Sequence, residues 1–179
     1  MRLVWWLPLE YWRVSLNRGA SPRLSELEQI ETALRPYTVV AAFDGQIGAM
    51  GTVRWSSLDK LGESIRLVDA AGASTPPLAR SAVDPAAVEV IDSLRPVFAT
   101  LLGELGENLH FFFFPGRDAK GAALLRPLEE GQLTVAIGTD SYVYRLPLGA
   151  LLPPKACPVD GERWSGAYRY CPRHGKPLE

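Results

Sequence analysis

Four consecutive phenylalanines, Phe111 to Phe114, constrain the fold of this 179-residue chain more than any other feature of its sequence. They follow His110 and precede Pro115 and Gly116. A continuous apolar run of this length, bounded by a Pro-Gly turn signal, predicts a strand that is buried on both faces. Because such a run on an open sheet edge promotes aggregation, we expect this strand to lie centrally in its sheet.

The length and composition of the chain permit such a core within one domain of ordinary size. Apolar residues make up 47% and charged residues 22%, which excludes global disorder and a collagen-like structure. Nineteen basic against 20 acidic residues give a formal net charge of −1. Charge therefore does not point to nucleic acid or an anionic membrane as a partner. Two cysteines are too few for a disulfide-rich secreted module.

Two hairpins are predicted apart from the phenylalanine strand. In the first, residues 37–43 are rich in β-branched and aromatic side chains and lead into the turn signal Asp44-Gly45 and a return strand over 46–55. In the second, apolar residues alternate over 133–137 and 142–146. We expect six to eight strands in all, including short strands over residues 2–7 and 64–69.

Two helical regions are predicted, over about residues 22–34 and about residues 85–105. Ser21 can cap the first, and Pro22 suits its first helical position. Pro96 lies in the middle of the second region, where it removes a backbone donor. We therefore expect a kink there, or two abutting helices.

The order of these elements predicts a mainly β or α+β fold. Strands joined by hairpins, without βαβ alternation, favour antiparallel sheets. We expect residues 1–150 to form an antiparallel β-sandwich with the two helical regions packed on one side or end. A half-open barrel is the alternative. A Pro-rich linker, residues 151–156, then leads to a tail of different composition over residues 157–179.

The tail contains the most specific motif of the chain, a pentapeptide that occurs twice. Cys157-Pro158-Val159-Asp160-Gly161 is echoed by Cys171-Pro172-Arg173-His174-Gly175. Each copy is therefore Cys-Pro-x-(Asp or His)-Gly. The pair resembles the two knuckles of zinc-ribbon and rubredoxin-like modules, in which each Cys-Pro-x-Cys-Gly turn presents two thiolates to one metal. The resemblance covers residues 157–175 and implies a small ribbon-like tail.

This resemblance implies a metal site made by Cys157, Asp160, Cys171 and His174. The aspartate and the histidine stand where these families usually have cysteines. Zinc accepts thiolate, imidazole and carboxylate ligands in a tetrahedral shell. With four protein ligands the site would be closed, so we expect one structural Zn²⁺ that stabilises the tail.

Two alternatives to a metal site stay open. In the first, the ribbon has lost its metal and is held together by Trp164, Tyr168 and Tyr170. In the second, Cys157 and Cys171 form a disulfide, which would indicate a periplasmic or secreted protein.

The first twelve residues are apolar and include Trp5, Trp6 and Trp12. They resemble a signal peptide only superficially, because no small-residue cleavage site follows. No apolar run approaches the ~18 residues of a membrane span, so we expect a cytoplasmic location. The three tryptophans either pack on the core or form an exposed anchor that binds a partner protein.

We find no catalytic motif in the sequence. Of the two histidines, His174 belongs to the tail motif, and His110 begins a predicted strand. A nucleophile elbow, a phosphate loop and a dinucleotide-binding turn are all missing. We therefore predict that the chain is not an enzyme. The expected function is protein–protein interaction, as an accessory or structural subunit of a larger assembly, with the tail stabilised by a structural metal.

Two other classes of function stay open. A small apolar ligand could bind in a sandwich or barrel lined by Phe111 to Phe114, Tyr142 and Tyr144. The weaker alternative is a contact of the tail with single-stranded nucleic acid. Residues 155–179 carry five basic and three acidic side chains, with aromatic residues between them.

Overall fold

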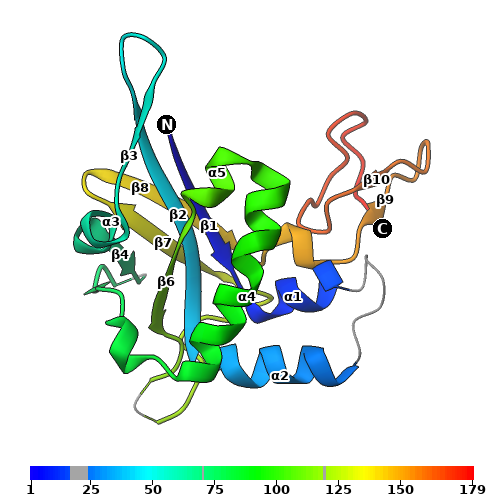
Figure 1. Ribbon diagram of the computed structural model, residues 1–179. Coiled ribbons are helices and arrows are strands. Elements are labelled where there is room, and N and C mark those ends of the chain that lie inside the picture. Colours follow the sequence, from blue (N-terminus) through cyan, green and yellow to red (C-terminus); the bar gives the residue numbers. More distant parts are fainter. Residues whose placement is uncertain (17–23, 70, 119) are drawn as a thin grey trace.

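The computed structural model describes residues 1–16, 24–69, 71–118 and 120–179, and it shows an α+β fold (Figure 1). Every strand pair in the described part of the chain is antiparallel. The prediction of an α+β fold with antiparallel sheets is confirmed, although the helices Leu9–Leu16 and Leu58–Ser64 lie outside the two predicted helical regions. The predicted helix start at Ser21 and Pro22 lies outside the described residues.

The first sheet is built around one long strand, β2 (Tyr37–Ile47). On one side β2 pairs with β1 (Arg2–Leu7), as Leu3↔Phe43 and Leu7↔Val39 show. On its other side β2 pairs first with β6 (His110–Pro115) and then with the short β3 (Val53–Trp55).

The second sheet has the order β5-β4-β7-β8. Its strands are β4 (Ile65–Val68), β5 (Ser74–Thr75), β7 (Gly131–Ile137) and β8 (Asp140–Leu146). The β7–β8 hairpin is the second predicted hairpin. Its turn contains Gly138 at a φ of 60°, in the left-handed region that favours glycine.

The described helices are α1 (Leu9–Leu16), α2 (Leu24–Leu34), α3 (Leu58–Ser64), α4 (Pro85–Leu102) and α5 (Glu104–Glu107). Short 3₁₀ turns occupy Arg80–Ala82 and Gly149–Leu151. Two abutting helices do not meet at Pro96, since α4 continues through this residue and ends at Gly103, where φ is 58°. Among the described residues, no helix combines the length and apolar character that a membrane crossing needs.

The first sheet lies between two hydrophobic layers. One face packs against α1, α2 and α4 through residues that include Leu7, Trp12, Leu34, Ile91 and Phe98. The opposite face packs against the second sheet and α3 through residues that include Trp6, Val40, Leu61, Ile65 and Val135. The second sheet and the helices thus cover opposite faces of the sheet around β2.

The phenylalanine strand contributes to both layers. Phe111 and Phe113 pack on the helical side, whereas Phe112 and Phe114 pack on the second sheet. At most 6% of any of these four residues is exposed. The prediction of a strand buried on both faces is confirmed.

The predicted central position of this strand is wrong. In the described chain β6 has one strand partner, β2, so it lies at an edge of the sheet. The segment before α4 covers part of this edge, where the Leu78 N–H donates to the Phe113 carbonyl at 2.7 Å. A covering loop, instead of a further strand, thus reduces the number of unpaired backbone groups that this edge strand exposes.

The predicted turn at Asp44-Gly45 is also wrong, because β2 continues through both residues to Ile47. Gly45 pairs with Trp55, whose ring lies 2.8 Å from the place where a Cβ on Gly45 would stand. This glycine therefore allows a close ring contact and does not reverse the chain. The reversal occurs later, where Gly51 adopts a φ of 79° and its N–H donates to the Gly48 carbonyl.

The tail carries its own small ribbon, β9 (Lys155–Ala156) paired with β10 (Arg163–Trp164). Strand β9 takes the last two residues of the predicted linker. Cys157, Cys171 and Leu178 form a separate buried cluster against which Trp164 packs. In Figure 1 the tail projects from the helical side of the molecule as two adjacent loops.

Candidate metal centre

The two pentapeptide motifs of the tail form equivalent turns. The Gly161 N–H donates to the Cys157 carbonyl and the Gly175 N–H donates to the Cys171 carbonyl, each at 2.8 Å. These glycines have φ values of 74° and 63°, which other residues rarely adopt. In each turn the cysteine N–H donates to the carbonyl five residues later, at 2.9 and 2.7 Å. The repeated sequence therefore reflects a repeated backbone structure.

The turns bring Cys157, Cys171 and His174 together. Nδ1 of His174 lies 3.4 Å from Sγ of Cys157 and 3.6 Å from Sγ of Cys171. All three ligand atoms lie within 4.8 Å of one another. Both cysteines are buried, and neither is in a disulfide.

These distances fit a tetrahedral zinc shell. Zn–S bonds of about 2.3 Å and Zn–N bonds of about 2.0–2.1 Å place sulfur and nitrogen about 3.6 Å apart at the tetrahedral angle. The two sulfur–nitrogen distances in the cluster are close to this value. The three side chains could therefore hold one zinc ion with little rearrangement.

Asp160 lies beside this cluster and outside the group of three. Its Oδ2 is 3.7 Å from Nδ1 of His174, and its Oδ1 accepts a hydrogen bond from the Glu162 N–H at 3.0 Å. The Arg173 guanidinium is 3.7 Å from Oδ2 of Asp160 and 3.4 Å from Oε2 of Glu162. The carboxylate thus lies beside His174 and has other partners as well.

Backbone donors favour negative charge at both sulfurs. Burial raises the pKa of the Cys157 thiol, although the N–H groups of Val159 and Asp160 act in the opposite direction. Burial opposes ionisation of Cys171 too, but the N–H groups of His174 and Arg173, together with the side chains of Cys157 and His174, lower the pKa of that thiol. N–H donors directed at sulfur stabilise the thiolate form that a metal needs.

The Asp160 carboxyl is held in its charged form. The hydrogen bond from the Glu162 N–H is the main cause of the lowered pKa of Asp160. The Cys157 thiol, His174 and Arg173 act in the same direction. An ionised carboxylate beside two cysteines and a histidine makes a donor set that suits a divalent cation of intermediate softness, such as zinc.

The tryptophans that were candidate partner-binding residues pack within the described fold. Trp6 and Trp12 are each 4% exposed. Trp5 is partly buried, and its ring makes edge contacts with Tyr11 at 5.5 Å and Phe98 at 5.7 Å. Their position favours a packing role over an exposed anchor.

The residues proposed to line a ligand cavity also make packing contacts. The four phenylalanines fill the layers on the two faces of the first sheet. The Tyr144 hydroxyl donates to the Val4 carbonyl at 2.8 Å and accepts from the Trp6 N–H at 3.3 Å, which joins β8 to β1. Tyr142 is partly buried against the same layer as Tyr144.

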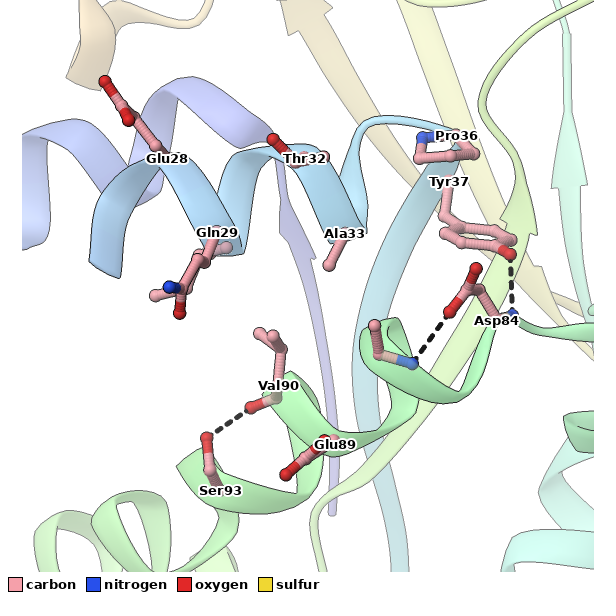
Figure 2. A pocket seen from close by; sticks show the side chains of 12 residues that line it. Glu28, Gln29, Thr32, Ala33, Pro36, Tyr37, Asp84, Glu89, Val90 and Ser93 are labelled. Carbon is pink, nitrogen blue, oxygen red and sulfur yellow. Dashed lines mark hydrogen bonds between the residues drawn. The ribbon is translucent and has the colours of Figure 1, made fainter. Parts of the chain in front are cut away.

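A groove between α2 and α4, of about 970 Å³, is a feature that the sequence did not suggest (Figure 2). The periodicity predicts one apolar face on the first helical region, with Glu28 on its solvated side. It does not reveal that a second helix lies alongside. Glu28 in α2 and Glu89 in α4 both line this groove.

No protein-family model, no curated protein and no solved structure matches this chain.

Proposed function

We propose that the tail is a zinc-ribbon-like module that binds one structural Zn²⁺ through Cys157, Cys171 and His174, with Asp160 as the fourth ligand. The observation that carries this proposal is the pair of sulfur–nitrogen distances, 3.4 and 3.6 Å, between two buried thiols and one imidazole. With four protein ligands the shell is closed, which makes the metal structural and not catalytic.

The small size of the tail core supports a structural role for the metal. Cys157, Cys171 and Leu178 are the buried hydrophobic residues of the tail, with Trp164 partly buried against them. A core this small provides little folding free energy, so the free energy of metal binding would supply much of the stability. Thiolate ligands require reduced cysteines, which agrees with the expected cytoplasmic location.

We further propose that the whole chain is a non-catalytic binding protein, an accessory or structural subunit of a larger assembly, whose stacked sheets form a β-sandwich. The β2–β3 hairpin supports this, since it extends well beyond the sheet (Figure 1). Its end carries Ile47, 63% exposed, and Met50, 93% exposed. A partner protein that covers this hairpin end would bury both apolar side chains.

A contact with single-stranded nucleic acid is a second candidate. Tyr168 is 47% exposed and Tyr170 is 61% exposed, with Arg169 between them. Bases stack on exposed aromatic rings, and basic side chains contact phosphates. Binding of a labelled oligothymidine that weakens with added salt, and that is lost in the Tyr168→Ala/Tyr170→Ala variant, would favour this candidate.

The metal proposal is tested by measuring the zinc content and zinc affinity of purified variants. We expect about one zinc per native chain, and a loss of affinity of at least about 100-fold in Cys171→Ser and in His174→Ala, beyond what an outer-shell change causes. Val159→Ala is the matched control, since this side chain lies in the same turn and is 58% exposed. It should keep the native affinity. A native protein that neither contains nor takes up zinc would overturn the proposal.

A further inference from the structure

The groove between α2 and α4 has the composition of a docking site. Its apolar part includes Ile30, Ala33 and Val90, and Figure 2 shows Ala33 and Val90 directed toward each other from the two helices. Ile30 and Val90 are only partly buried against the core, so apolar surface stays accessible in the groove. Tyr37 and Asp84 lie at one end of the groove, where the Asp84 N–H donates to the Tyr37 hydroxyl at 2.9 Å.

The charges that line the groove are all negative. Glu28, Asp84 and Glu89 are the ionisable acids among the lining residues, which include no lysine, arginine or histidine. Asp84 caps α4 by accepting the Ala86 N–H at 2.8 Å. Glu28 and Glu89 are exposed, and neither forms an ion pair with another described residue.

Elsewhere on α4, an acidic side chain does have basic partners. Asp92, three residues after Glu89, forms ion pairs with Arg80 and Arg95. Arg80 and Arg95 are therefore paired with Asp92, which does not line the groove. The two glutamates on either side of the groove are left without a basic partner in the described chain.

We propose that the α2–α4 groove binds an amphipathic helix of a partner protein, one that carries lysine or arginine on both sides of an apolar stripe. The stripe would cover Ile30, Ala33 and Val90, and the basic flanks would pair with Glu28 and Glu89. The 11 residues of α2 extend about 16 Å, which matches a partner helix of about three turns. The inference deepens the proposed function of a binding protein and is independent of the zinc site.

The test selects peptides that bind the full-length protein from a phage-displayed library. The peptides are helical, about 14 residues long, and their side chains are randomised at the positions that face outward from the helix. The selected peptides should carry an apolar stripe flanked by lysine or arginine. A synthetic copy of the most enriched peptide should bind the Glu28→Lys/Glu89→Lys variant at least about tenfold more weakly than the native protein. Its affinity for the native protein should fall as salt is added.

The matched control is the Glu63→Lys/Glu130→Lys variant, which makes the same change in net charge at two exposed glutamates outside the groove. It should bind the peptide with native affinity.

The inference is overturned if no peptide is enriched, if the selected peptides are neutral or acidic, or if both double variants bind equally. It is also overturned if the groove mutations instead abolish self-association in sedimentation, because the occupant would then be a second copy of the chain. Zinc content is measured on the same samples, so that a failure of the groove proposal can be distinguished from a failure of the zinc proposal.

Discussion

At the scale of single residues, the tail is where the sequence predicted most. The two similar pentapeptides and their resemblance to zinc-ribbon knuckles predicted a site of four residues, and the structure groups three of them, Cys157, Cys171 and His174. Each turn has a glycine in the left-handed region at its fifth position, so the two motifs share a backbone conformation as well as a sequence pattern. The ion pair of Asp160 with Arg173 could not be predicted, because it depends on how the two turns face each other.

The role of Asp160 can be separated from that of the other three residues. Asp160→Asn keeps the side-chain shape but removes the negative charge beside the cluster. Because Asp160 is the proposed fourth ligand, we expect this variant to bind zinc at least about 100-fold more weakly than the native protein, beyond the loss that an outer-shell change causes, measured by competition with a chromophoric chelator. An unchanged affinity would mean that the carboxylate is not a ligand and that water completes the shell.

Asp44 offers a pH-dependent prediction away from the tail. The hydrogen bonds from the Arg2 guanidinium, at 3.0 and 3.1 Å, are the main cause of the lowered pKa of Asp44. A carboxyl with a lowered pKa in the folded state stabilises the fold above its unfolded pKa of about 3.9, and this contribution disappears as the pH falls through the folded value.

We therefore expect Asp44→Asn to lower the free energy of unfolding by about 1 kcal/mol at neutral pH, since the pair is mostly shielded from water. In urea titrations the difference from the native protein should shrink as the pH is lowered below about 4. A difference that grows on acidification would contradict the assigned role of this ion pair.

At the scale of elements, local sequence patterns predicted where strands occur better than they predicted how the strands pair within a sheet. The alternation over β7 and β8 and the phenylalanine run of β6 identified strands correctly. The edge position of β6 was missed, because covering by the Leu78 segment depends on contacts distant in sequence. The Asp44-Gly45 signal failed for a similar reason, since packing against Trp55 also requires a glycine.

The phenylalanine strand should contribute strongly to stability. Phe114 is 0% exposed and lies between β6 and the second sheet. We expect Phe114→Ala to reduce the free energy of unfolding by about 3–5 kcal/mol, because it leaves a cavity in a packed layer. Val143→Ala on β8, where the side chain is 52% exposed, is the control and should change it by less than about 0.5 kcal/mol. Equal effects of the two variants in chemical denaturation would contradict this packing arrangement.

Pro96 lies within α4 without ending it, and the residue is exposed. Alanine at this position would restore a backbone donor inside the helix and remove the ring clash. The loss of proline rigidity in the unfolded chain offsets part of this gain. We expect Pro96→Ala to raise the free energy of unfolding by about 1–2 kcal/mol in urea titrations. A less stable variant would show that the ring makes contacts that the helix needs.

At the scale of the whole molecule, the chain combines a large core with a tail that has almost none. The sheet around β2 is covered by helices on one face and by the second sheet on the other. The tail packs closely on its linker, where Gly166 lies so near Pro153 that a Cβ would stand 2.3 Å from the Pro153 carbonyl oxygen. The α+β class with antiparallel sheets was predictable from element order, whereas the groove between α2 and α4 emerged only from the packing of two helices distant in sequence.

The central claim, that the tail is held by one zinc ion, is tested most directly by the intact mass of the purified protein. The mass is measured under native conditions without added metal, and again after denaturation. We predict a native mass heavier by one zinc per chain, and a denatured mass equal to that of the reduced, unmodified chain. An unmodified mass in both states, or a denatured mass lighter by two hydrogens because Cys157 and Cys171 are bridged, would contradict the account.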